Sequence, residues 1–213
     1  VFPEVYLSND NSGRIAQINA NMKRYIDTGV FSVLKSTFIY TKRTVTGGKV
    51  RRGVVGLIDL CDYSYEKGSK TLIRATEETV PERIPPRVTI RKDAPLELPH
   101  IMLLIDDPDM TVIAPLDKKT ADSKPLYDFD LMLGGGHITG KALDGKAAAE
   151  MQEALNALIE DSDDKLLFAV GDGNHSLASA KECYRINKTE NSRYALVEIV
   201  NIHDDSLEFE PIY

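Results

Sequence analysis

A strand–loop–helix junction at residues 166–184 constrains the fold of this chain more than any other segment. The apolar run at residues 166–170 predicts a buried strand, and residues 177–184 predict a helix. The tight polar loop between them contains Gly171, Asp172, Gly173, Asn174, His175 and Ser176. Two glycines let the backbone bend sharply and approach a ligand, and a helix start offers N–H groups with a partial positive charge. The sequence therefore predicts a phosphate-binding loop, in which the glycines, Asn174 and Ser176 contact the phosphate.

A loop of this composition can also serve only to turn the chain. Gly, Asp and Asn are favoured in turns and at helix N-caps even where nothing binds. The spacing matches neither the phosphate loop that ends in Gly-Lys-Ser/Thr nor the dinucleotide-binding fingerprint with three spaced glycines. A binding role and a purely structural role are therefore both open for this loop.

Three blocks of the sequence, at residues 56–88, 166–184 and 193–212, resemble the family catalogued as domain of unknown function 1015. The resemblance covers nearly the whole chain and implies a longer bacterial or archaeal protein. We therefore expect residues 1–213 to be a single domain and a fragment of a longer polypeptide. Two lobes, at residues 1–95 and 96–213, are the alternative organisation.

The glycine loop is also distantly similar to the loop of the ParB and sulfiredoxin superfamily, which includes free-serine kinases. This resemblance implies that the phosphates of ATP or ADP, with Mg²⁺, bind where the loop enters a helix. The serine-kinase pattern Asp-Gly-His-Thr-Arg corresponds to Asp172, Gly173, Asn174, His175 and Ser176. Because Ser176 stands in the place of arginine, the loop lacks a charge-assisted contact of about 1–3 kcal/mol. The loop also has no cysteine, which argues against the sulfinic-acid reduction of sulfiredoxin.

A long charged segment that ends in two successive prolines is the second candidate site. Other branches of the resembling family have a His-Glu-x-Thr pattern here, which Thr76, Glu77 and Thr79 match except at the histidine. The resemblance makes Glu77 a general base or a magnesium ligand. Arg74 and Arg83 then replace the arginine that is absent from the glycine loop. The alternative is a solvated loop of mixed charge.

Three functions follow from these two segments. The first is a nucleotide-dependent phosphotransferase acting on a small hydroxylated molecule, in which Gly171 and Gly173 shape the phosphate cradle. In that mechanism Asp172 holds magnesium or positions the acceptor hydroxyl, and His175 contacts a phosphate oxygen. The second is a non-catalytic module that binds a nucleotide or another small ligand with the same loop. The third is a structural or interaction domain, in which these side chains only stabilise the turn.

The composition excludes several other classes of protein. With 42% hydrophobic and 28% charged residues, the chain has the composition of a soluble globular protein. Its net charge of −7 argues against a nucleic-acid-binding protein or a protein of anionic membranes, and no apolar run is long enough to span a bilayer. The two cysteines are far apart in the sequence and favour a reducing cytoplasm over a disulfide framework. The oligomeric state stays open.

The periodicity predicts an α+β fold with a mixed sheet, because strand hairpins occur together with the strand–loop–helix unit. The glycine triplet at residues 134–136 predicts a hairpin turn before a return strand. Helices are expected at residues 8–28, 144–159 and 177–184. Strands are expected at residues 31–41, 50–60, 87–91, 100–105, 111–116, 127–133, 166–170 and 193–201.

Overall fold

One mixed β-sheet organises the computed structural model, which describes residues 10–45, 47–98 and 101–207. Within these residues the sheet has nine strands in the order β3-β4-β8-β5-β9-β2-β1-β7-β6. They are β1 (Ile39–Thr44), β2 (Val50–Asp59), β3 (Tyr63–Ser64), β4 (Ile73–Ala75), β5 (Met102–Ile105), β6 (Tyr127–Asp130), β7 (His137–Ala142), β8 (Phe168–Asp172) and β9 (Tyr194–Asn201). Strands β3, β4 and β8 are parallel, as are β5 and β9, and the other neighbours are antiparallel. The predicted α+β class with a mixed sheet is confirmed.

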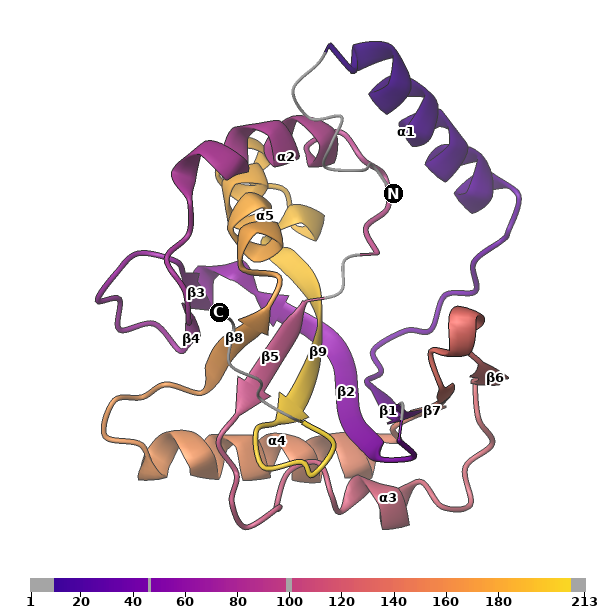
Figure 1. Ribbon diagram of the computed structural model, residues 1–213, viewed down its shortest axis with the longest axis vertical. Helices are drawn as coiled ribbons and strands as arrows, with labels where there is room; N and C mark the ends of the chain where they lie inside the picture. The colour runs from indigo at the N-terminus through magenta and orange to yellow at the C-terminus, as the bar shows by residue number, and fades with distance from the viewer. Residues whose placement is uncertain (1–9, 46, 99–100, 208–213) are drawn as a thin grey trace.

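Five α-helices surround the sheet in the described residues. They are α1 (Ser12–Asp27), α2 (Ile84–Arg91), α3 (Leu116–Lys119), α4 (Gly145–Asp161) and α5 (Asn174–Asn187). Figure 1 shows α4 running across one end of the central strands, whereas α2 and α5 lie side by side at the other end and α1 lies beyond them. None of the described helices has the length and apolar character that crossing a membrane requires.

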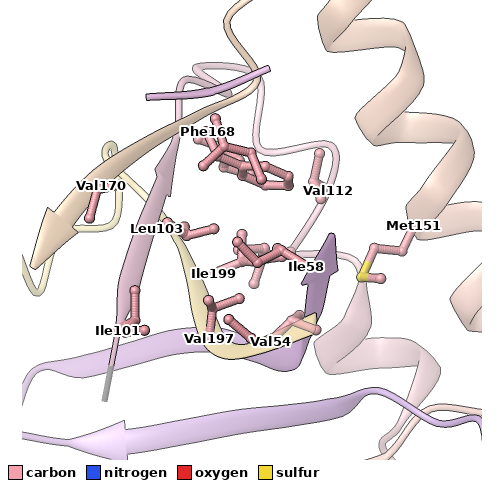
Figure 2. Packing of buried hydrophobic residues seen from close by; sticks show 14 of the residues in the cluster. Val54, Ile58, Ile101, Leu103, Val112, Met151, Phe168, Val170, Val197 and Ile199 are labelled. Atoms are coloured by element: carbon pink, nitrogen blue, oxygen red, sulfur yellow. The ribbon is translucent and has the colours of Figure 1, made fainter. Parts of the chain in front are cut away.

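The core forms where alternate residues of neighbouring strands point to the same side of the sheet. Leu103 of β5 and Ile199 of β9 are paired in register, and both are buried. Figure 2 shows them beside Ile58 and Phe168, with Met151 of α4 reaching toward the same cluster. Apolar contacts thus hold the sheet against α4. The polar loops lie at the end of the central strands that is opposite α4 (Figure 1).

Helix α4 begins where the sequence predicts. Asp144 precedes its first turn, and its Oδ1 atom accepts a hydrogen bond of 2.7 Å from the Ala147 amide. A carboxylate at this position satisfies one of the N–H groups that lack an intrahelical partner. The expected first helix is also confirmed as α1, whereas residues 8–9 of that prediction and residue 100 of a predicted strand lie outside the described residues.

The predicted strand at residues 87–91 is wrong, because these residues belong to α2. Two prolines occupy the first turn of this helix, where proline lacks only an N–H group that would have no intrahelical partner. The two prolines at the end of the charged segment therefore begin a helix. The correction matters for function because α2 packs against α5.

Two other predicted strands differ from the structure. Residues 111–116 form no strand, because the buried Asp107 carboxylate accepts hydrogen bonds from the amides of Thr111 and Val112, at 3.0 and 2.8 Å, and folds the segment into a turn. The strand predicted at residues 31–41 begins only at β1, after Ser36, whose φ of 50° is incompatible with a continuous strand.

Candidate functional site

The site lies at the edge of the sheet where β4 and β8 end. The two strands are parallel and neighbouring, with Ala75 opposite Val170, so the chain leaves both strands at the same edge. Ligands of α/β sheets commonly bind beyond the carboxyl ends of parallel strands. A hydrogen bond of 2.6 Å from the Thr76 hydroxyl to the Val170 carbonyl holds the two exits together. This pairing brings the segment that contains Glu77 next to the glycine loop.

The glycine loop forms a tight turn into α5. Gly173 is the N-cap of α5 and has a φ of 85°, a left-handed conformation that glycine adopts without steric cost. Its carbonyl accepts the first hydrogen bond of the helix from the Leu177 amide, at 2.9 Å, and its amide donates to Asp172 Oδ1 at 2.7 Å. Among the described residues the amides of Asn174 and Ser176 have no partner. The helix start therefore offers main-chain donors, and it already holds one carboxylate.

Glycine occurs at position 171 for a different physical reason than at position 173. A Cβ atom at Gly171 would lie 2.8 Å from Cγ of Leu104 on the neighbouring β5. The Leu104 side chain occupies the space that a Cβ atom would need, which favours glycine here whether or not a ligand binds. Of the two glycines expected to shape a phosphate cradle, only Gly173 has the unusual backbone conformation.

A cavity of about 270 Å³, here called the loop cavity, opens onto this turn. Its lining consists of Glu77, Arg87, Gly171, Asp172, Gly173, Asn174, His175 and Ser176. Arg87 comes from α2, which the packing of α2 on α5 brings to the cavity. The structure thus combines main-chain donors, one guanidinium and two carboxylates in one small volume.

Asn174 is the least satisfied polar group of the loop cavity. The residue is only 7% exposed, and its Oδ1 atom is buried without a hydrogen-bond partner among the described residues. The buried hydroxyl of Thr79, two residues after Glu77, likewise has no partner in the described part of the chain. Leaving a buried polar group unpaired costs about 1–3 kcal/mol, and such groups often mark a binding site. An ordered water or a donor group of a ligand would satisfy this acceptor atom of Asn174.

His175 links the two segments of the site. Its Nε2 atom accepts a hydrogen bond of 3.2 Å from the Val80 amide. A ring nitrogen that accepts from an amide carries no proton, so in the neutral imidazole the proton is on Nδ1. In this structure His175 holds the segment after β4 against the start of α5, and its Nε2 atom is engaged in that contact.

The two arginines expected to replace the missing loop arginine lie elsewhere. Arg74 forms an ion pair with Asp164 and donates to the Thr71 carbonyl at 2.8 Å. Neither Arg74 nor Arg83 is among the described residues that line the loop cavity. Arg87 takes that place, and only the correction of residues 87–91 from strand to helix reveals it.

The site has no ready-made metal centre. The described residues contain no group of three or more His, Cys, Asp and Glu side chains that could hold a metal ion. The carboxylates of Glu77 and Asp172 both line the loop cavity, however. Mg²⁺ usually keeps several waters and binds through one or two carboxylates together with substrate phosphates. The donor set therefore fits a magnesium ion that arrives with a phosphorylated ligand.

The second glycine-rich turn, at residues 134–136, lies at the other side of the sheet and leads into β7 as a hairpin. His137 at its end lies between two carboxylates: Nδ1 is 2.7 Å from Asp130 Oδ1, and Nε2 is 2.5 Å from Asp128 Oδ1. The hydrogen bond to Asp130 and, as a smaller contribution, the one to Asp128 raise the pKa of His137 above its usual value of 6.5.

We expect this histidine to give a pH-dependent contribution to stability. Because its pKa is raised in the folded state, the contribution is fully present below pH 6.5 and is lost as the pH rises through the folded-state pKa. An NMR titration of the imidazole should place the His137 pKa above 6.5, and the double variant Asp128→Asn, Asp130→Asn should return it to that value. An unchanged pKa in the double variant would contradict the contact.

Comparisons with known proteins give one match. No curated protein and no solved structure matches the chain. A family model described as "Protein of unknown function (DUF1015)" matches residues 1–213.

Proposed function

The chain belongs to this family of proteins of unknown function, and from the geometry of its site we propose that it is a nucleotide-dependent phosphotransferase. The nucleotide phosphates bind at the start of α5, and the phosphoryl group passes to a small hydroxylated molecule. The observation that carries the proposal is the loop cavity, where amides at the start of α5 that have no partner among the described residues lie beside the Arg87 guanidinium. The Oδ1 atom of Asn174, also unpartnered in the described part of the chain, is an acceptor for a ligand hydroxyl. We propose likewise that the strand–loop–helix unit is of the ParB and sulfiredoxin kind.

An anion is favoured at this position for two physical reasons. The N-terminal amides of a helix point outward with a partial positive charge, and Arg87 adds a guanidinium, the side chain best suited to phosphate oxygens. The Asn174 carboxamide can donate to a phosphate oxygen through Nδ2 or accept from a ligand hydroxyl through Oδ1. In the free protein the carboxylate of Asp172 accepts a hydrogen bond from the amide of Gly173.

The negative charge of the site, once phosphates bind there, favours a bound magnesium ion. Phosphate oxygens beside Glu77 and Asp172 would repel both carboxylates unless a cation lies between them. Asp172 and the phosphates would hold a Mg²⁺ ion, which would remove this repulsion and supply charge neutralisation for phosphoryl transfer.

The transfer itself needs positioning and one proton acceptor. The hydroxyl oxygen of the acceptor attacks the γ-phosphorus, the bond from the γ-phosphorus to the β–γ bridging oxygen breaks, and the nucleoside diphosphate leaves. Glu77 accepts the hydroxyl proton. His175 positions the Glu77 segment through its contact with Val80.

Isothermal titration with ATP, ADP and CTP, each with and without Mg²⁺, tests the proposal. Arg87→Ala should weaken binding of ATP with Mg²⁺ by about 10–150-fold, because a charge-assisted hydrogen bond contributes about 1.5–3 kcal/mol. Arg83→Ala removes an arginine from the preceding turn and should change the affinity less. Asp172→Ala should abolish the magnesium dependence. Absence of binding at millimolar nucleotide, in wild type and variants alike, would contradict the proposal.

A non-catalytic nucleotide-binding module is the second candidate, favoured by the engagement of Arg74 with Asp164. In that case one arginine serves the loop cavity, which is enough for binding but less than phosphoryl transfer commonly employs. Transfer of phosphate from ATP to a panel of hydroxy-amino acids and other small alcohols distinguishes the two: binding without transfer selects the module. If Asp172→Ala leaves binding unchanged and lowers only stability, by about 1–2 kcal/mol as for a lost cap, the loop is structural.

A further inference from the structure

A second and larger hollow adjoins the loop cavity. This groove, of about 590 Å³, lies between α1 and the segment formed by α2 and the residues after it, and we call it the α1 groove. Arg87 and Ser176 line both the α1 groove and the loop cavity. The two hollows therefore share part of their walls, as a single ligand reaching into both would require. Figure 1 shows α1 facing the α2–α5 pair.

The two hollows differ in chemistry. The loop cavity is polar and charged, whereas most of the α1 groove is apolar. Its side chains include Ile15, Ile18, Met22, Ile90, Leu96 and Leu98. Two aromatic rings, Tyr25 and Phe31, also line it and remain exposed. Exposed aromatic rings beside a phosphate-binding loop fit a ligand with a flat, stackable part.

One polar atom in the α1 groove narrows the choice of ligand. The Oδ1 atom of Asn19 is buried without a hydrogen-bond partner among the described residues. A saturated acyl or prenyl chain in the groove would leave this oxygen unpaired. An asparagine amide accepts from the exocyclic amino group of adenine and donates to its N7 atom. Guanine presents two acceptors at the same edge, so it would satisfy the Oδ1 atom only if it turned its opposite edge, which carries its donors, toward Asn19.

We propose that the α1 groove binds the adenosine part of the nucleotide whose phosphates bind in the loop cavity. This inference rests on the proposed function and adds the identity of the base. The adenine ring stacks on Tyr25 or Phe31 and pairs with Asn19, and Arg87 lies at the junction, where the phosphates begin. Helix α1, which has no buried residue of its own, thereby acquires a role as one wall of the nucleotide site.

The test compares a nucleotide with its phosphates alone. ATP, GTP and inorganic tripolyphosphate, each with Mg²⁺, are titrated into the wild-type chain by calorimetry. We expect ATP to bind at least about tenfold more tightly than tripolyphosphate or GTP, because stacking and a paired base edge each contribute at that scale. Asn19→Leu and Phe31→Ala should each weaken ATP binding about tenfold and leave tripolyphosphate binding unchanged.

A matched control separates local from general effects. Val33→Ala alters an apolar residue that is 83% exposed and lies outside the groove lining among the described residues, so ATP binding should not change. Thermal unfolding of each variant verifies that it is folded. Equal affinities for ATP and tripolyphosphate, unaffected by Asn19→Leu and Phe31→Ala, would overturn the inference and leave the proposed function standing. Binding of neither probe would overturn both.

Discussion

Replacing Glu198 with alanine should lower the free energy of unfolding by about 3–5 kcal/mol, the cost of removing one partner of a buried ion pair. Glu198 Oε2 lies 3.0 Å from Nη2 of Arg51, and the two side chains are only 10% and 12% exposed. The other carboxylate oxygen accepts a hydrogen bond of 3.2 Å from the Thr41 hydroxyl. In the alanine variant the guanidinium of Arg51 would remain buried without its counter-charge. Urea unfolding followed by circular dichroism measures the loss.

Two further variants separate the charge from the packing. Glu198→Gln keeps the shape and one acceptor oxygen, so it should cost less than the alanine change. The double variant Arg51→Met, Glu198→Leu removes both charges and fills a similar volume, and we expect it to recover most of the lost stability. If the double variant is as unstable as Glu198→Ala, then packing rather than the unpaired guanidinium explains the effect.

This ion pair also explains a glycine in the middle of the sheet. A Cβ atom at Gly53 would lie 2.6 Å from Oε1 of Glu198 on the neighbouring strand. Glycine at this position leaves room for a carboxylate inside the sheet. Neither the glycine nor the glutamate carries a local sequence pattern that reveals the other, because the contact joins β2 to β9 across 145 positions of the chain.

The elements that the sequence predicts correctly are those decided by nearby residues. Helix α4 has an N-cap aspartate and an apolar face within one segment, and its start is where the pattern places it. The errors occur where a tertiary contact or an unusual backbone conformation determines the secondary structure. Asp107 turns residues 111–116 away from a strand, and the positive φ of Ser36 delays β1. Such effects depend on tertiary structure and backbone conformation, which hydrophobic periodicity does not register.

The same distinction applies to the site. The turn from β8 into α5 is local, and the glycines and polar residues predict its position, but Asn174, His175 and Ser176 belong to the first turn of α5 rather than to a loop. The approach of Glu77 depends on the parallel pairing of β4 with β8, which only the sheet order reveals. Arg87 depends on α2 being a helix that packs on α5. The α1 groove depends on the placement of α1 across from α2, whereas the apolar face of α1 alone predicts a buried core face.

The arrangement of the helices therefore determines the volume of the candidate site as much as the loop does. The loop cavity alone, at about 270 Å³, holds little more than phosphates and a metal ion. The α1 groove adds about 590 Å³ on the far side of Arg87. A ligand that fills both must have one charged and one apolar end, and the proposed nucleotide has this chemistry.

Gly136→Ala should be the other strongly destabilising change, at about 2–5 kcal/mol. A Cβ atom at this position would lie 1.7 Å from the carbonyl oxygen of Thr44, at the end of the neighbouring β1. The residue also has a φ of 90°, which costs an L-residue about 1–2 kcal/mol. Relieving the overlap requires the backbone of the β6–β7 hairpin to move, at about 1–3 kcal/mol. The Leu131 amide, which donates to the Gly136 carbonyl at 2.7 Å, would lose its partner in that movement.

Gly134→Ala is the matched control for this prediction, because it isolates the backbone cost from the overlap. Gly134 belongs to the same turn and also has a positive φ, of 69°, but a Cβ atom there would meet nothing within 4 Å. We expect it to lose only about 1–2 kcal/mol. Urea unfolding compares the two variants, and hydrogen exchange should show faster exchange in β7 for Gly136→Ala alone. Equal unfolding midpoints would mean that β1 and β7 do not approach as closely as described, and the register of this edge of the sheet would need revision.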